Sequence, residues 1–180
     1  HLLALSNKVL TLAKLEQHKL EMNKKEVPLS PMIEDLIEKF TIKTEKTIHF
    51  TTDLKTEKVY ADEEFLKEAI SNLIDNAIKY SKESVKINIS SSSDANHDII
   101  NIYDNGIGIP QKDQKKIFEK FERASAIKQT RKGGPSGFGL GLNYVYQVME
   151  AHEGRVYINS IEGEFSEFSL LIPKIIESYD

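Results

Sequence analysis

The sequence contains no cysteine. It therefore has no disulfide framework, no thiolate metal site and no cysteine nucleophile, which fits a reducing compartment. It also lacks any apolar run near the roughly 20 residues that a membrane-spanning helix requires, and its first residues do not form a secretory signal. We expect this segment to lie in the cytoplasm, with any membrane anchor outside it.

Positive charge is in the minority, with 24 Lys and Arg against 28 Asp and Glu, for a net charge of -4. Proteins that bind a nucleic acid backbone normally carry a basic excess on one face, so the balance argues against a nucleic acid partner. The 180 residues, 39% of them hydrophobic, suffice for one good core and a small appendage. We expect one main domain.

The first residues carry an apolar stripe typical of a helix. Leu2, Leu5, Val9 and Leu12 are spaced 3, 4 and 3 apart, and further apolar residues widen the stripe: Leu3, Leu10 and Ala13. The heptad-like spacing resembles half of a helical hairpin or coiled coil. Because the stripe is already under way at His1, we interpret the chain as a piece of a longer protein.

The rest of the chain alternates between helix and strand signals. Ser30 and Pro31 predict a helix start, with Ser30 as N-cap, and Asp62 predicts the N-cap of a long helix that ends near Ser81. Strands are expected at 48–52, 58–61, 84–91, 98–103, 155–160 and 165–172, and shorter helices near 113–121 and 140–152. The predicted fold is α+β, a two-layer α/β sandwich whose mixed sheet is covered on one face by helices.

One polar stripe lies on the long predicted helix. Asn72, Asn76, Lys79 and Tyr80 stand at i, i+4, i+7 and i+8 and can therefore meet one ligand. Mg²⁺ is commonly held by one or two protein oxygens together with phosphates, so a carboxamide beside a lysine suits a metal–triphosphate complex. On their own, two asparagines are better explained by the polar needs of a helix–loop boundary, and the other motifs reverse this preference.

Two glycine-containing segments follow. Asp104 ends an apolar strand and precedes Gly106, Gly108 and Ile109; a carboxylate accepts from an exocyclic amine, and glycines let the backbone approach a flat ring, which predicts an adenine pocket. An ordinary turn after a strand is the alternative. The later glycines open a helix whose first amides suit phosphate: Gly137, Gly139 and Gly141, with Leu140 and Leu142 between and after them.

The segment between these glycines is locally basic. Residues 122–137 contain Arg123, Lys128, Arg131 and Lys132 against Glu122 alone. This composition suits a lid that closes over phosphates, although a solvated charged loop has the same composition. The aromatic residues that precede it, Phe118 and Phe121, are expected to anchor it mainly by packing.

The four stretches 72–80, 104–109, 118–123 and 137–142 resemble, in order and spacing, the N, first glycine, phenylalanine and second glycine boxes of bacterial sensor histidine kinases. The resemblance covers roughly residues 57–173. It extends to the wider superfamily of DNA gyrase, heat-shock chaperone and mismatch-repair ATPases. The late stretch from His152 to Arg155 also resembles the closing strands of the kinase domain.

The resemblance implies ATP as substrate and Mg²⁺ as metal, with Asn76 as the metal ligand. It implies catalytic roles for Asn72, Asn76, Lys79 and Arg123. The implied nucleotide-binding residues are Asn76, Lys79, Tyr80, Asp104, Gly106, Gly108, Ile109, Phe121, Arg123, Lys132, Gly137, Gly139, Leu140, Gly141 and Leu142. Gyrase-like ATPases carry a glutamate base where Asn72 stands, so Asn72 favours transfer to a protein histidine over ATP hydrolysis.

Residues 1 to about 22 resemble the second helix of the dimerisation and phosphoacceptor hairpin of these kinases. We therefore expect a partial hairpin over 1–25 and a catalytic ATP-binding domain over 26–180. None of the five histidines lies in the acceptor motif of the family. We expect the fragment to bind Mg-ATP without phosphorylating itself.

The resemblance also implies partners. These are a response-regulator receiver domain, which accepts the phosphoryl group on an aspartate, and a second copy of the full-length protein, bound through the hairpin. Membrane contact is expected only through N-terminal regions of the parent, an inner-membrane sensor. Two other functional classes stay open: a nucleotide-binding regulatory module that works by interaction, and a protein-serine kinase of the anti-sigma type.

Overall fold

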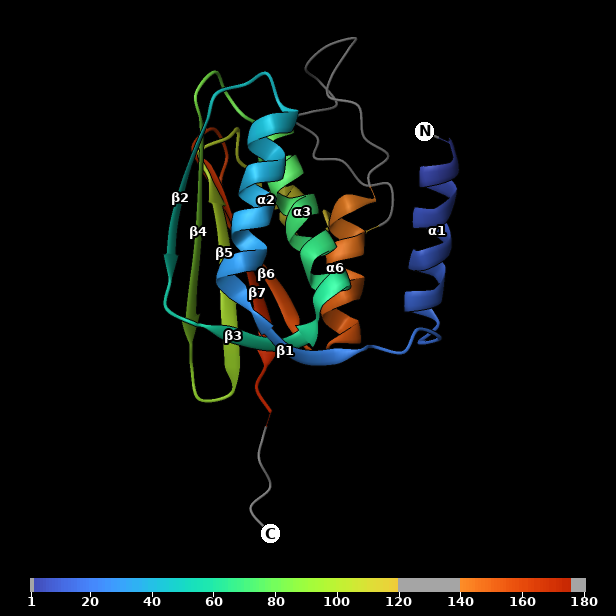
Figure 1. The fold of residues 1–180 in the computed structure, drawn as a ribbon. Coiled ribbons are helices and arrows are strands. Elements are labelled where there is room, and N and C mark those ends of the chain that lie inside the picture. The colour runs from blue at the N-terminus through green and yellow to red at the C-terminus, as the bar shows by residue number, and fades with distance from the viewer. Residues whose placement is uncertain (1, 120–139, 176–180) are drawn as a thin grey trace.

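The computed structural model describes residues 2–119 and 140–175. Within them a mixed sheet has the strand order β2-β4-β5-β7-β6, and α2, α3 and α6 cover one of its faces (Figure 1). The sheet strands are β2 (Ile48–Leu54), β4 (Val85–Ser93), β5 (His97–Asp104), β6 (Arg155–Ile161) and β7 (Phe165–Pro173). The helices are α2 (Leu29–Lys43), α3 (Glu63–Lys79), the short α4 (Gln111–Gln114) and α6 (Gly141–Ala151). The predicted two-layer α+β fold is confirmed.

The register of the sheet places Asp104 at the end of a central strand. β2 runs parallel to β4, and the β4–β5, β5–β7 and β7–β6 pairs are antiparallel. Asp104 lies opposite Ile87 of β4 and Ser166 of β7. A side chain flanked on both sides by strands loses most of its contact with water, and Asp104 is buried.

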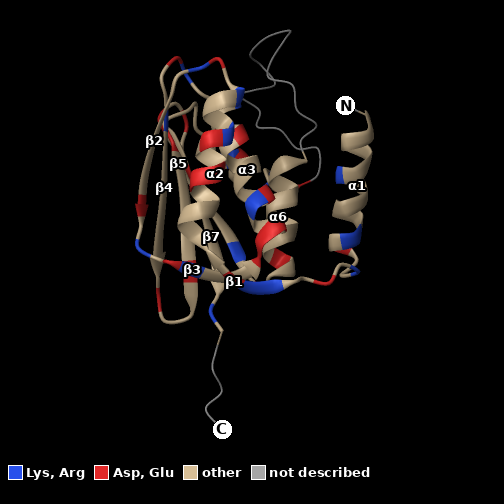
Figure 2. Ribbon diagram, in the orientation of Figure 1, with Lys and Arg blue, Asp and Glu red and all other residues tan. Residues whose placement is uncertain are grey.

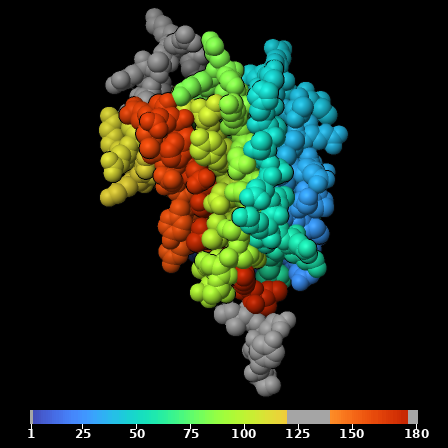
Figure 3. Space-filling model, turned by 90° about the vertical axis from the view of Figure 1, so that its left-hand side faces the viewer, coloured from blue at the N-terminus to red at the C-terminus, as the bar shows by residue number. Residues whose placement is uncertain are grey.

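The core lies between the sheet and the helices. Strands β4, β5 and β7 bury alternate residues, as a half-covered sheet requires. Burial of each such side chain contributes about 1.5–3 kcal/mol. Among residues 2–119 and 140–175, no helix covers the opposite face of the sheet, which faces the viewer in the space-filling view (Figure 3). The fully buried residues of this layer include Ile70, Leu73, Ile74, Ile87, Ile89, Ile100, Ile102, Val145, Val148 and Leu170.

The start of α3 is fixed as the sequence predicts. Asp62 is its N-cap, and its Oδ1 accepts a hydrogen bond from the Phe65 N–H at 3.2 Å. The backbone N–H of Asp62 donates to His152 Nε2 at 2.9 Å, and His152 Nδ1 lies 2.7 Å from the Val148 carbonyl. The neutral Nδ1–H tautomer satisfies both bonds. This buried imidazole therefore joins the start of α3 to the end of α6.

The start of α2 is not as predicted. The helix begins at Leu29 with Pro28 as N-cap and no side-chain cap bond, so the assignment of Ser30 as N-cap is wrong. Strand β1 (Lys24–Pro28), which the sequence does not indicate, runs directly into α2 and pairs antiparallel with β3 (Lys58–Asp62). Leu29 is fully buried and its N–H donates to the Glu57 carbonyl at 2.9 Å. This backbone partner replaces the expected cap.

Helix α1 (Leu2–Glu16) lies beside α6, on the side away from α2 (Figure 1). It ends where His18 adopts a left-handed conformation with φ of 52°. The predicted apolar stripe is divided: Leu12 and Leu15 are buried, whereas Leu2 and Leu3 are 85% and 78% exposed. None of the helices that the structure describes has the length and hydropathy needed to cross a membrane.

Two other boundaries differ from the prediction. The helix expected near 113–121 is the single turn α4, Gln111–Gln114, and the long helix ends at Lys79. The ends of α3 and α4 are set by backbone hydrogen bonds, which cannot be recognised from the pattern of residues in the sequence. The Tyr80 N–H, for example, closes α3 by donating to the Asn76 and Ile78 carbonyls.

Candidate functional site

The polar stripe of α3 reaches the surface only in its last turns. Asn72 is buried, and its Nδ2 donates to the Glu68 carbonyl at 3.0 Å. One turn later Asn76 is half-buried and has no hydrogen bond from its side chain to another described residue. Lys79 is also half-buried, and its ammonium lies 2.7 Å from Asp75 Oδ2. Within the described part of the chain nothing engages the amide of Asn76, while the charge of Lys79 is offset by a neighbouring carboxylate.

The turn that follows β5 is attached to the end of α3. The Ile107 N–H donates to the Tyr80 carbonyl at 3.1 Å. Gly106 makes this approach possible, because a Cβ there would lie 2.7 Å from the Tyr80 oxygen and 2.6 Å from Asp104 Oδ1. The structure thus brings the Asp104 turn beside the residue that ends the polar stripe.

The carboxyl group of Asp104 is buried with only part of its hydrogen-bonding capacity used. Oδ1 accepts from the Gly106 N–H at 2.8 Å, and Oδ2 has no hydrogen bond to a described residue. Burial raises the pKa of Asp104 to about 6, which the Gly106 hydrogen bond opposes. A half-satisfied, desolvated acceptor of this kind suits a ligand that brings its own N–H donor.

The second half of this turn rests on the β6–β7 connection. Gly108 has φ of +66°, and a Cβ there would lie 2.0 Å from the Ile161 carbonyl oxygen. The Ile109 N–H donates to Ser160 Oγ at 2.8 Å, and the Gly163 N–H donates to the Ile107 carbonyl at 2.6 Å. Gly106 and Gly108 therefore each allow close contact with protein backbone. This requirement is separate from any approach to a ligand ring.

The first turn of α6 reaches the same region. Leu140 is buried at the N-cap, and Gly141 and Leu142 are half-buried. A Cβ on Gly141 would lie 3.5 Å from Asn72 Oδ1, so the glycine that opens α6 faces the polar stripe of α3. The free N–H groups of a first helical turn carry partial positive charge.

The remaining predicted site residues lie outside the described residues: Phe121, Arg123, Lys132, Gly137 and Gly139. Phe118, which precedes them, packs against Tyr146 and Phe168, with ring centroids 6.1 Å and 6.3 Å away. Asn143 Nδ2 donates to the Phe118 carbonyl at 2.8 Å, while its buried Oδ1 has no partner. This bond joins the segments on either side of residues 120–139, and no sequence pattern predicts it.

One residue beside this site was not predicted. Lys8 of α1 donates from Nζ to Asn72 Oδ1 at 2.9 Å. Lys8 stands in a 3-4-3 series with Leu5, Leu12 and Leu15, the face of α1 that packs inward. A lysine within an otherwise apolar seam was the available signal.

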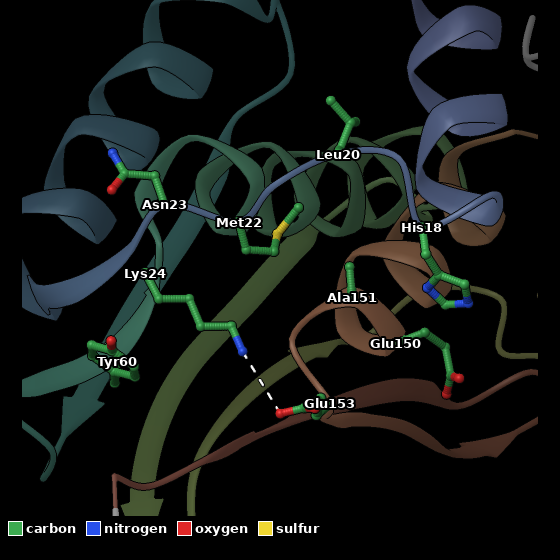
Figure 4. Close-up of a pocket in the computed structure, with 9 residues that line it drawn as sticks. All are labelled: His18, Leu20, Met22, Asn23, Lys24, Tyr60, Glu150, Ala151 and Glu153. Atoms are coloured by element: carbon green, nitrogen blue, oxygen red, sulfur yellow. Dashed lines mark ion pairs between the residues drawn. The ribbon is translucent and has the colours of Figure 1, made fainter.

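A separate hollow of about 620 Å³ lies beneath α1 (Figure 4). It is bounded by the linker after α1, by Tyr60 of β3 and by the last residues of α6, with Lys24 and Glu153 4.0 Å apart across it. This end of α6 is opposite to Gly141, and neither Asn76 nor Asp104 lines the hollow. Its lining residues are His18, Leu20, Met22, Asn23, Lys24, Tyr60, Glu150, Ala151 and Glu153.

We predict that Gly108→Ala is more destabilising than Gly163→Ala. Both positions have positive φ, and a side chain at either costs about 1–2 kcal/mol. Only Gly108 also faces a carbonyl, since nothing lies within 4 Å of a Cβ on Gly163. Urea unfolding should show an additional loss of about 2 kcal/mol for Gly108→Ala. Equal losses for the two variants would contradict the packing described for this turn.

Comparison with known proteins identifies the family. Residues 61–176 match the family described as histidine kinase-, DNA gyrase B-, and HSP90-like ATPase. The adaptive-response sensory kinase SasA of Crocosphaera subtropica is 32% identical over 169 residues, which cover 92% of this chain and 43% of SasA. The sensor histidine kinase WalK of Bacillus subtilis is 30% identical over 183 residues, which cover 99% of this chain and 30% of WalK. The chain thus spans less than half the length of these relatives.

The fold agrees with that of a solved kinase. The histidine kinase AdeS of Acinetobacter baumannii superposes with a TM-score of 0.77 at 26% identity, over 94% of this chain and 77% of the AdeS chain. The family match contains Asn72, Asn76 and Asp104. The chain belongs to the histidine kinase-, DNA gyrase B-, and HSP90-like ATPases, and it is the ATP-binding catalytic domain of a sensor histidine kinase.

Proposed function

We propose that the site between α3, the Asp104 turn and the first turn of α6 binds Mg-ATP and presents its terminal phosphate to a histidine of another chain segment. The buried Asp104 carboxylate carries this proposal. Its second oxygen accepts no hydrogen bond from a described residue and would accept one from the exocyclic amine of adenine. Such a bond offsets part of the free energy that its desolvation costs.

The Asn76 amide fits the role of metal ligand. Among the described residues, no group of three or more histidine and carboxylate side chains is placed to hold a metal ion. Asn76 offers one hard oxygen at the surface end of α3, and Mg²⁺ that arrives with a nucleotide needs only one or two protein oxygens beside the phosphates. When bound, Mg²⁺ would neutralise charge on the phosphate chain.

Transfer to histidine is favoured over hydrolysis by the chemistry of Asn72. An amide cannot remove a proton from an attacking water, so this position holds no general base. Two of the described histidines are already engaged: both ring nitrogens of His152 are hydrogen-bonded in the core, and His97 Nδ1 lies 3.5 Å from Asp94. None of the histidines in the sequence lies in the acceptor motif of the family. The acceptor histidine then belongs to a separate hairpin segment.

The partners follow from this assignment. A response-regulator receiver domain would take the phosphoryl group from the acceptor histidine, and the full-length protein would form a homodimer through its hairpin. The names of the relatives, a sensory kinase and a sensor histidine kinase, favour this assignment over an anti-sigma-type serine kinase. The other alternative, a regulatory module that binds ATP without transferring its phosphate, is distinguished from a kinase by the transfer experiment described below.

We predict that Asn76→Ala weakens binding of Mg-ATP by about tenfold or more, or ~1.4 kcal/mol, because a metal ligand is lost. Isothermal titration calorimetry with and without Mg²⁺ measures this. The loss should be confined to the titration that contains Mg²⁺. Asn88→Ala is the matched control, since Asn88 bonds to Thr51 on the sheet and should leave the affinity unchanged.

The same proteins test transfer. The unaltered domain should label an added acceptor-hairpin protein with the γ-phosphate of ATP, should not label its own histidines, and should lose the transfer with Asn76→Ala. Tight ATP binding with no transfer to any hairpin acceptor would instead indicate a binding module.

We predict that Asp104→Asn has opposite effects on binding and stability. The pKa of Asp104 in the folded protein lies above its usual 3.8, so the protonated group favours folding at low pH and this contribution is lost as pH rises through about 6. Removing the charge should stabilise the nucleotide-free domain at pH 7.5 by about 1–3 kcal/mol. It should also weaken adenine nucleotide binding about tenfold, because a charge-assisted hydrogen bond is lost.

Urea unfolding and nucleotide titration from pH 5 to 8 measure both effects. The affinity of the unaltered domain should fall as pH drops through about 6, and Asp104→Asn should remove this dependence. Asp98→Asn serves as the control, since Asp98 is buried at the other end of the same strand and accepts from Ser93. An Asp104→Asn domain that keeps full affinity would exclude Asp104 as the adenine acceptor.

A further inference from the structure

Lys8 of α1 contacts Asn72 and thereby adds a second ammonium group, beside that of Lys79, to the proposed nucleotide site. Lys8 donates to Asn72 Oδ1 at 2.9 Å, and its ammonium also lies 5.6 Å from the centroid of the buried Tyr144 ring. Tyr144 belongs to the first turn of α6, close to Gly141 in sequence. Lys8 therefore lies where α3, α6 and α1 meet.

The charge of Lys8 is only weakly compensated. Its direct partners are a neutral amide oxygen and an aromatic ring, and it forms no ion pair with a described carboxylate. Burial lowers the pKa of Lys8 from its ordinary value, and the positive charge of Lys79 lowers it further. The negative charges of Glu68 and Asp75 act in the opposite direction. An ammonium held in this way gains from a nearby anion.

Lys79 is less free to serve an anion than Lys8. The Lys79 ammonium lies 2.7 Å from Asp75, so a ligand phosphate would have to compete with that carboxylate. Asn72, the partner of Lys8, lies one turn from Asn76, and its Oδ1 also lies near Gly141. The ammonium of Lys8 thus borders the region that the metal ligand and the first turn of α6 share.

We propose that Lys8 is part of the nucleotide site: α1 holds its ammonium against Asn72, and from there it binds the terminal phosphate of ATP. This inference rests on the nucleotide site proposed above. Lysine commonly binds phosphate as a compact point charge. The helix that precedes the catalytic domain would then supply a residue that distinguishes ATP from ADP.

Packing of α1 explains how Lys8 is positioned. Leu12 and Leu15, one and two turns further along, are almost fully buried. The linker that follows α1 borders the hollow of Figure 4 rather than a filled core. The two leucines therefore hold the helix, and Figure 2 shows its basic residues on a helix otherwise poor in charge.

Calorimetric titration with Mg-ATP and Mg-ADP tests the proposal. Lys8→Met should weaken ATP binding about tenfold while changing ADP binding by less than about threefold. Lys8→Arg, which keeps the charge, should retain most of the preference for ATP. Lys14→Met, which removes an exposed lysine from the same helix, should have no effect.

A second variant tests the role of α1. Leu12→Asp should remove the packing of α1 and reduce the preference for ATP to the level of Lys8→Met. An unchanged preference in either Lys8→Met or Leu12→Asp would overturn the proposal, and so would equal losses for ATP and ADP, which indicate a structural role. If the unaltered domain bound neither nucleotide, the nucleotide site itself would be refuted.

Discussion

The hydrogen bond from the Ile107 N–H to the Tyr80 carbonyl determines the geometry of the site. It attaches the turn after β5 to the end of α3, and it requires that residue 106 have no Cβ, since a methyl group there would meet both the Tyr80 oxygen and the Asp104 carboxylate. The buried face of α3 fixes the helix on the sheet, so its polar stripe has one possible orientation. The Asp104 turn thus lies beside Tyr80 at the end of this stripe, which supports the proposal that the carboxylate and the amides, about thirty residues apart in sequence, serve one ligand.

The proposed site contains two under-compensated charges of opposite sign. Asp104 is desolvated, with one oxygen that accepts no hydrogen bond from a described residue, and Lys8 is desolvated beside a neutral amide. Both reduce the stability of the empty domain, and both gain from a ligand that carries an N–H donor at one end and phosphates at the other. ATP is such a ligand, with the exocyclic amine of adenine at one end and the phosphates at the other. On this proposal, the residues that bind nucleotide lower the stability of the folded domain, a common feature of binding sites.

Much of this arrangement could be predicted from the sequence because it depends on local patterns. The Asp62 cap, the buried face of α3 and the β4–β5 hairpin all have strong periodic or turn signals, and the predicted mixed sheet with helices on one face is confirmed. Strand β1 was missed because only Val27 of its five residues is buried, so it carries no alternation. The start of α2 and the contacts of Lys8 and Asn143 were missed because each depends on a partner far away in the chain.

The central claim is that Asn76 and Asp104 border one nucleotide pocket, distinct from the hollow beneath α1. A titration of the ¹⁵N-labelled domain with Mg-ADP, followed by NMR, tests it most directly. The side-chain amide of Asn76 and the backbone amides of Gly106 and Ile107 should shift together, with one dissociation constant, while Leu20 and Met22 in the linker do not shift. Different midpoints for the two groups, or shifts confined to the linker, would contradict the account.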